Sequence, residues 1–395
     1  MKTKSLLFLF LSTTFVFATS IEELVQTTFE KNYTLHGLEK AIGSANENIV
    51  LAKKWENPML DFGVNDIALE NAETRDLERF VGVTQVIPMG NKLEYKEKIA
   101  LKDKAILDLT LEDKKLELQS KIYELGFSIA LLEKRRTLFE NYLNNIKKLE
   151  QISTAQYENN QTLQTQVLST HILYTKIGLQ KLKLETTIKN LYVQLEELTQ
   201  EKIETLEINL GQYAKELKIN YENHPKLKIQ ELLAQQSLTQ VKLEAENKIP
   251  DIALSVAYVQ RQSEYDEYVN VSVAIPLAIY GTENSKVVQA MSKSQEELSQ
   301  LNTLEKEFKT QTELLKNEFD TAIKSIDLVK STLLPTQQKM QEALELYNAL
   351  EKAKLEEVVA SLNEYIEYEF LLLDEQSSYF QTLAKAMYYN KGVIQ

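Results

Sequence analysis

Two long stretches with helical spacing of apolar residues constrain the fold of this chain more than any other feature. They run from about Lys92 to Tyr157 and from about Asn284 to Leu350, and Pro335 is the one proline they contain. Apolar residues recur every three or four positions from Leu298 to Ile326, as in amphipathic helices that pack together. About 65 residues at 1.5 Å rise give a helix on the order of 100 Å long. With 10 Gly and 6 Pro in 395 residues, turns must be few, and a mainly α fold is predicted.

Each long helix is expected to fold back on itself, because another helical stretch follows it. These second stretches run from Thr162 to about Gln200 and from Leu355 to about Tyr389. The reversals are predicted at residues 158–161 and near residues 350–354. The chain is therefore expected to contain two long antiparallel coiled-coil hairpins.

Four short segments have strand character instead, and four of the six prolines stand at their ends. In one of them, valine and isoleucine alternate with Asn270, Ser272 and Ala274, which is the period-two pattern of a strand with unlike faces. We predict four strands in two hairpins, at Met59 to Leu69, Arg79 to Ile87, Asp251 to Gln260 and Tyr268 to Ile275.

The landmarks of the two halves recur at a spacing of about 190 residues, which predicts an internal duplication. Pro58 and Pro250 are 192 positions apart, and Gly90 and Gly281 are 191 apart. A unit of this length is too long for a solenoid repeat. The predicted first repeat covers 19–200, with its strand pair at about 59–87. The second covers 201–395, with its strand pair at about 251–276.

The N-terminus has the composition of a secretory signal peptide. Lys2 and Lys4 precede the uncharged run Ser5 to Phe17, and Ala18 ends a small-residue cleavage pattern. We predict a signal peptide at 1–18 and export of the mature chain from Thr19. The run is too short to span a bilayer as a helix, which takes roughly 20 residues. The formal charge of −13 disfavours nucleic acid as a partner, and the absence of cysteine excludes disulfides and thiol chemistry.

Strands of about ten residues match the length that crosses a bilayer when tilted. Four strands cannot do so alone, because an open sheet leaves two unpaired edges that lipid cannot hydrogen-bond. Two copies would supply eight strands and three copies twelve. An aromatic girdle at the interface is expected from Tyr258, Tyr265, Tyr268 and Tyr280. The alternative is a pair of β-hairpins that caps a soluble coiled coil.

Several motifs follow one another in an order typical of one family. They are QVIPMGNK at Gln85–Lys92, VSVAIPL at Val271–Leu277, NHPKL at Asn223–Leu227, and the turn tyrosines Tyr157 and Tyr347. With these motifs and a signal peptide that lacks a lipidation cysteine, the mature chain resembles the TolC family of outer membrane efflux proteins over essentially its full length. The resemblance implies a homotrimer whose 12-stranded transmembrane β-barrel continues into a periplasmic helical barrel.

The same resemblance implies an outer membrane channel, the exit duct of a tripartite efflux or type I secretion system in a Gram-negative bacterium. Its expected partners are two further copies, outer membrane lipid, a periplasmic adaptor protein and an inner-membrane RND or ABC transporter. Conduction through such a duct is passive and needs no cofactor. The alternative function is that of a soluble periplasmic coiled-coil structural or adaptor protein.

The resemblance also suggests residues for a channel constriction. Matching Leu355-x-x-Val358 to the family's pattern places Glu357 at the first of two acidic positions, and the second falls on Ala360. Three copies of Glu357 around a narrow lumen would attract cations. Gln164 and Thr165 match the polar positions that hold the closed state. The alternative for Glu357 is an ordinary exposed residue of a helix.

Adaptor docking requires accessible residues at the helical turns. The candidates are Asn159, Asn160, Gln161, Thr162 and Leu163 in the first half, and Glu351, Lys352, Ala353, Lys354 and Leu355 in the second. Asn160 stands where the family usually has glycine, and asparagine tolerates the left-handed conformation. Glu351, at about the corresponding place, tolerates it poorly, so the second tip is expected to differ in shape. Leu163 and Leu355 have packing as their alternative role.

No catalytic or metal-binding pattern is visible in the sequence. The histidines His36, His171 and His224 lie far apart, and the 58 carboxylates are distributed over amphipathic helices. Such carboxylates are mostly solvated side chains rather than acid and base pairs. We therefore expect neither an enzyme nor a metal site.

Overall fold

The computed structural model describes residues 19–65, 77–211, 213–261, 266–349 and 355–390. The predicted signal peptide and the predicted tip residues Glu351, Lys352, Ala353 and Lys354 lie outside these ranges. The chain divides into two compact units. Unit 1 contains the described residues of Met1–Leu35, Lys114–Tyr221 and Lys309–Gln395, and unit 2 contains those of His36–Asp113 and Glu222–Phe308. Each unit contains residues from both halves of the sequence, so these units do not correspond to the two predicted repeats. The internal duplication stays a prediction.

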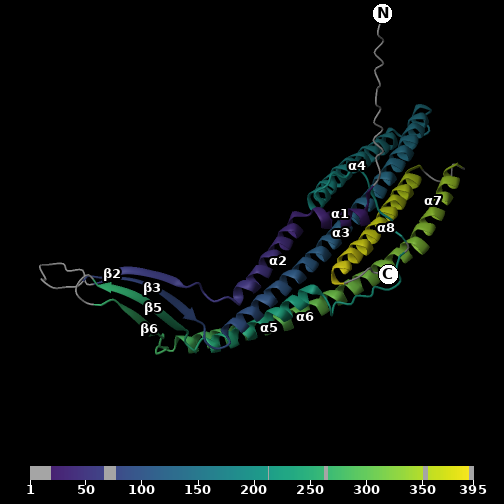
Figure 1. The fold of residues 1–395 in the computed structure, drawn as a ribbon. Helices are drawn as coiled ribbons and strands as arrows, with labels where there is room; N and C mark the ends of the chain where they lie inside the picture. Colours follow the sequence, from purple (N-terminus) through teal and green to yellow (C-terminus); the bar gives the residue numbers. More distant parts are fainter. Residues whose placement is uncertain (1–18, 66–76, 212, 262–265, 350–354, 391–395) are drawn as a thin grey trace, which may run out of the picture. The chain divides into compact units, whose positions relative to one another are not determined.

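Helices dominate the described residues, and the mainly α fold with a small β part is confirmed (Figure 1). Helices α3 and α6 each contribute residues to both units. The helices are α1 (Ile21–Lys31), α2 (Tyr33–Ala52), α3 (Lys92–Glu158), α4 (Gln164–Thr199), α5 (Pro225–Glu246), α6 (Thr282–Leu328), α7 (Leu334–Ala349) and α8 (Leu355–Tyr389).

The second long helical stretch contains a π-helical turn, η1 (Val329–Leu333), between α6 and α7. Here the backbone N–H of Leu334 donates to the carbonyl of Val329, five residues back. Pro335 follows directly, and a proline ring has no N–H and clashes with the carbonyl four residues earlier. The wider turn accommodates that clash without ending the helix. The sequence indicated the proline but not this local change of helix type.

The core of unit 1 is aromatic. Phe127 of α3 lies 4.8 Å from Phe380 of α8 between ring centroids, and Phe319 of α6 lies 5.0 Å from Tyr379. The Tyr379 hydroxyl accepts a 2.8 Å hydrogen bond from the backbone N–H of Ala214, which ties the segment after α4 to this core. Of the positions with helical spacing, Phe308, Leu315, Phe319 and Ile326 of α6 are buried, whereas Leu298 is exposed.

The first described residues belong to the core of unit 1. Strand β1 (Thr19–Ser20) pairs in parallel with β4 (Leu206–Glu207), and the Ser20 hydroxyl accepts a hydrogen bond from the N–H of Glu23 as the N-cap of α1. Ile21 is buried in the next turn. Gly126 of α3 leaves room for this contact, because a Cβ there would overlap the Ile21 side chain. The predicted mature N-terminus is therefore a structural element.

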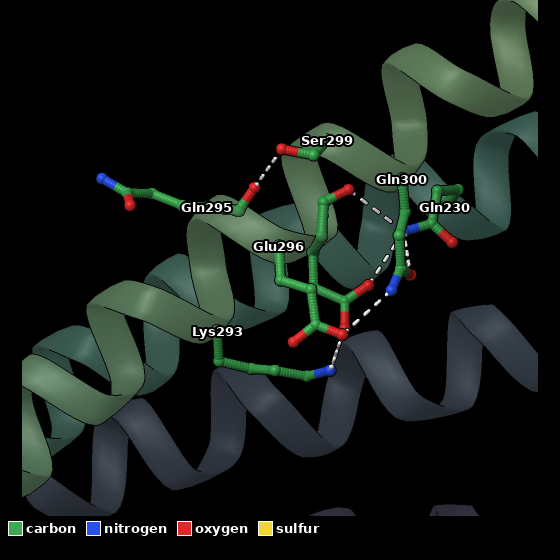
Figure 2. A network of polar contacts seen from close by, with 7 residues as sticks. Gln230, Lys293, Gln295, Glu296, Ser299 and Gln300 are labelled. Atoms are coloured by element: carbon green, nitrogen blue, oxygen red, sulfur yellow. Dashed lines mark hydrogen bonds and ion pairs between the residues drawn. The ribbon is translucent and has the colours of Figure 1, made fainter.

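Unit 2 has a buried polar network between α5 and α6 (Figure 2). The Gln230 amide nitrogen of α5 donates to the Glu297 carbonyl at 3.2 Å and to its carboxylate at 2.8 Å. The Lys293 ammonium lies 3.1 Å from the same carboxylate. Glu297 is 9% exposed, and a buried charge requires such partners. The hydrogen bonds between Gln230 and Glu297 therefore fix which residues of α5 and α6 lie next to each other.

Four strands of unit 2 form one antiparallel sheet in the order β2-β3-β5-β6. The strands are β2 (Met59–Asn65), β3 (Glu78–Ile87), β5 (Ile252–Arg261) and β6 (Tyr268–Ala274). The central pair runs from Glu78 opposite Arg261 to Ile87 opposite Ile252. Two hairpins that lie far apart in the sequence thereby become one sheet.

Candidate functional site

The register of the sheet places most of its large apolar side chains on one face. Residues directly opposite each other in neighbouring strands share a face, and one such row is Phe62, Val81, Tyr258 and Val269. We call this the apolar face, and the exposed fractions of its exposed large apolar residues run from 37% to 80%. These residues are Leu60, Phe62, Val64, Val81, Val83, Leu254, Val256, Tyr258, Val269, Val271 and Val273, and Arg79, Gln85 and Gln260 lie on the same face.

The opposite face, which we call the polar face, carries the small and polar residues of the sheet, together with Met59, Phe80, Val86, Val259 and Tyr268. One row consists of Asp61, Gly82, Ala257 and Asn270. The Thr84 hydroxyl donates a 2.8 Å hydrogen bond to the Asp61 carboxylate. One face rich in exposed large apolar residues and one face that carries the polar residues fit a sheet between lipid and an aqueous conduit.

Tyr268 lies on the polar face, so it does not share a face with Tyr258, the other described strand tyrosine of the predicted girdle. It pairs with Val259 and packs under the Arg261 guanidinium, 4.7 Å from its ring centroid. Arg261 in turn forms a 3.1 Å ion pair with Glu78. The sequence already indicated this face, because Tyr268 and Asn270 are two positions apart in the same strand and side chains alternate between the faces. Tyr258 does lie on the apolar face, and Tyr265 is outside the described residues.

The sheet has two open edges. Among the described strands, β2 and β6 each pair with a single neighbour, while β3 and β5 pair on both sides. An open edge presents backbone N–H and C=O groups without partners. Water can satisfy these groups and hydrocarbon cannot, so in a membrane this sheet needs further strands at both edges.

The junction between the sheet and the helices is held by charged groups. The Lys92 ammonium at the start of α3 lies 2.6 Å from the Asp251 carboxylate and 2.6 Å from the Ile249 carbonyl, and the Met89 N–H donates to Asp251 at 2.9 Å. Partial burial opposes ionisation of Asp251. The hydrogen bonds from Lys92 and Met89 outweigh that effect and hold the pKa of Asp251 below its ordinary value.

Gly90 makes the turn at this junction, as the sequence predicts for a glycine that opens the long helix. Its φ is +72°, in the left-handed region. A Cβ there would lie 2.5 Å from the Glu246 carboxylate of α5, which accepts a 3.1 Å hydrogen bond from the Asn91 N–H. Glycine is therefore favoured by the backbone conformation, and a side chain here would also displace the Glu246 carboxylate from the Asn91 N–H.

The predicted first tip is the turn between α3 and α4. Asn160 adopts φ +58°, so the left-handed conformation expected for the family's glycine position is confirmed. Leu163 is 70% exposed, which excludes a packing role within the described chain. Gln164 and Thr165, in the first turn of α4, are also exposed, as are Asn159 and Gln161, while Thr162 is half-buried. These residues lie together and accessible at one end of the helix pair.

Directly behind this turn, α3 and α4 bury small polar residues that the sequence reasoning missed. Ser153, Gln166 and Thr170 are buried, and the Ser153 and Thr170 hydroxyls donate to backbone carbonyls of their own helices. Because the Ser153 and Thr170 hydroxyls are hydrogen-bonded within their own helices, α3 and α4 can pack closely at these positions. The i, i+4 spacing of Gln166 and Thr170 is the one signal that could have revealed this stripe.

Glu357 lies on the exposed side of the first turns of α8. Val358, Ser361 and Leu362 form the buried side there, and the Gln337 side-chain amide of α7 donates to the Ser361 carbonyl at 3.1 Å. Leu355 begins the helix. The structure therefore brings Glu357 to a surface and not into the core, and its role in a constriction stays a prediction.

The histidines lie in separate environments. His36 and His171 each approach a carboxylate of the helices, Glu39 at 3.2 Å and Glu150 at 2.7 Å. His224 is buried as the N-cap of α5, where its Nδ1 accepts from the Lys226 N–H. Within the described ranges, no three His, Cys, Asp or Glu residues are grouped so that they could hold a metal ion.

None of the described helices combines the length and the apolar character that a membrane span requires.

Comparison with known proteins places this fold among outer membrane channels. No protein-family profile and no curated protein sequence matches the chain. Among solved structures, a membrane protein from Pseudomonas aeruginosa is similar with a TM-score of 0.81 and 10% identity, over 93% of this chain and 92% of that one. The Campylobacter jejuni CmeC outer membrane channel gives a TM-score of 0.79 at 11% identity, over 95% and 86%.

The open Neisseria gonorrhoeae MtrE outer membrane channel gives a TM-score of 0.78 at 12% identity, over 93% of this chain and 88% of that one. At such identities the likeness concerns the fold, and it confirms the fold expected from the resemblance to the TolC family. The similar structures named here span almost the whole chain, both helices and sheet.

Proposed function

We propose that three copies of this chain form an outer membrane channel, which serves as the exit duct of a tripartite efflux or type I secretion system. The observation that carries this proposal is the sheet, with its exposed apolar face, its polar face and its two open edges. The fold shared with outer membrane channels supports the same reading. The chain then acts by conduction and contributes no chemical step.

The dimensions of the sheet suit an outer membrane. Strands β3 and β5 contain 10 residues each. At about 3.4 Å per residue and a tilt of about 40°, such a strand rises about 25 Å, the height of the apolar band of outer membrane proteins. The apolar face would then contact lipid, and the polar face would line the conduit.

Closure of the sheet favours a trimer. A strand β6 of one copy would pair with β2 of the next, which satisfies both open edges and gives twelve strands for three copies. Two copies would give eight strands, whose interior is filled by side chains. A conduit for solutes therefore favours three copies over two.

We place the contacts with other proteins at the exposed end of α3 and α4. Asn159, Asn160, Gln161, Thr162 and Leu163 are proposed to dock a periplasmic adaptor, which connects the duct to an inner-membrane RND or ABC transporter. Gln164 and Thr165 directly follow and are proposed, with Glu357, to act at the constriction. The exposure of Leu163 and of the neighbouring Asn159, Asn160 and Gln161 supports this assignment, because a docking partner can reach these residues.

Fractionation and conductance test the proposal together. Cells that produce the full chain are separated into soluble and outer membrane fractions, and the purified protein is reconstituted in a planar bilayer. We expect an outer membrane protein that migrates as a heat-dissociable trimer and forms ion-conducting channels. A chain found entirely in the soluble periplasmic fraction would refute the proposal and favour the alternative of a coiled-coil structural or adaptor protein.

A further inference from the structure

The polar face contains one charge that no other group on that face neutralises. Its charged residues within the described strands are Asp61, Glu78 and Arg261. Glu78 and Arg261 form an ion pair at the loop end of the sheet and cancel each other. Each copy therefore contributes a net charge of −1 to this face, and its source is Asp61.

Asp61 is held in place by its neighbours. It lies on β2 between Leu60 and Phe62, which point to the apolar face, and opposite Gly82 of β3. The Thr84 hydroxyl donates to its carboxylate at 2.8 Å and lies 3.0 Å from the Ser255 hydroxyl, so that it connects β2 with β5. Asp61 is exposed, and its neighbours on this face include Gly63 and Gly82, which carry no side chain.

We propose that Asp61 is a selectivity residue of the sheet, at which three carboxylates favour cations over anions halfway along the strands. The inference rests on the proposed channel of three copies. It is independent of Glu357, which lies on α8 in the other unit of the chain. The conduit would thus discriminate charge in the membrane region as well as at any constriction of the helices.

The size of the effect follows from the geometry of a closed sheet. Twelve strands 4.8 Å apart with a tilt of about 40° form a cylinder with a radius of about 12 Å. The carboxylates would lie within about 10 Å of its axis. The Debye length is about 10 Å at 0.1 M salt, 30 Å at 0.01 M and 3 Å at 1 M. The potential of the three charges therefore reaches the axis at low salt and is screened at high salt.

Reversal potentials across planar bilayers with a KCl gradient test this proposal, because K⁺ and Cl⁻ diffuse at similar rates. We expect Asp61→Asn to lower the ratio of cation to anion permeability about twofold near 0.1 M salt, more at 0.01 M and not measurably at 1 M. Asparagine is isosteric and still accepts the Thr84 hydrogen bond, so the sheet should be preserved.

Glu267→Gln is the matched control. Glu267 precedes β6 and its carboxylate accepts a hydrogen bond from the Tyr258 hydroxyl on the apolar face, so this variant removes a carboxylate from the other side of the sheet. It should leave the permeability ratio unchanged. An equal effect of Glu267→Gln, or conducting Asp61→Asn channels with the wild-type ratio, would overturn the proposal.

Failure of the variant and failure of the channel give different results. If the wild-type chain forms no channel, the proposed function itself is wrong. If wild type conducts but Asp61→Asn does not assemble, Asp61→Ser serves as a second variant, because serine removes the charge and still offers an oxygen to Thr84. If neither variant assembles, Asp61 has a structural role in the sheet and the selectivity proposal is overturned.

Discussion

An arginine on the apolar face should prevent stable membrane insertion, whereas an arginine on the polar face should be tolerated. Val271 and Ser272 are neighbours in β6 and point to opposite faces, Val271 in a row with Val256, Val83 and Leu60. They lie near the middle of the sheet, which in the proposed channel would be the most apolar depth of the bilayer. The variants Val271→Arg and Ser272→Arg differ by one position and carry the same added charge.

The expected cost comes from the depth of the residue. An arginine that faces lipid near the bilayer midplane costs about 2–4 kcal/mol in outer membrane barrels. With one such residue in each of three copies, Val271→Arg should cost about 6–12 kcal/mol per assembled trimer. Ser272→Arg faces an aqueous conduit and should cost less than about 1 kcal/mol, with a change in conductance as its main effect.

The assay compares both variants with wild type in outer membrane fractions and by the temperature at which the trimer dissociates in detergent. We expect Val271→Arg to lose the trimer band and to accumulate outside the outer membrane, while Ser272→Arg behaves as wild type. Equal tolerance of both variants would refute the assignment of the apolar face to lipid. A greater loss for Ser272→Arg would indicate that the two faces are reversed.

Three further substitutions test other parts of the structure. Gly90→Ala should lower stability by about 1–2 kcal/mol in thermal unfolding, because φ is +72° and the new Cβ would meet Glu246, and an unchanged unfolding temperature would contradict the strained turn. The lowered pKa of Asp251 beside Lys92 stabilises the fold above the unfolded-state pKa of about 4, and this contribution is lost as the pH falls through the lower folded-state value. Asp251→Asn should therefore lower stability at pH 7 and flatten the loss of stability in acid, and an unaltered pH profile would argue against this pair. Glu357→Gln should change cation conductance in reconstituted channels if Glu357 lines a constriction, and unchanged conductance and selectivity would remove it from the proposed site.

The local elements could be predicted because their causes are local. Apolar residues at helical spacing and the absence of proline determine α3 from Lys92 to Glu158. The alternation of Val271 and Ser272 predicts a strand with unlike faces and even shows which residues share a face. The left-handed turn at Asn160 also follows from residue type, because asparagine tolerates this conformation better than other non-glycine residues.

Pairing between distant segments was decided by the tertiary structure. No local signal says that β3 and β5, from opposite halves of the chain, lie side by side, and this pair is what joins the two hairpins into one sheet. Glu297 is buried next to Gln230 of another helix. Its neighbours in the sequence give no sign of this, because they have the pattern of a solvated helix face.

The type of most elements, the unlike faces of β6 and the resemblance to outer membrane channels could all be predicted from the sequence. Short-range sterics and periodicity control the type of an element and its faces, and a window of a few residues shows them, whereas the resemblance rests on the order of motifs along the chain. Only the paired strands show that Glu78 is neutralised by Arg261, whereas Asp61 has no opposite charge on its face of the described strands. Charge cancellation depends on distances between residues far apart in the chain, and such distances exist once the strands have paired.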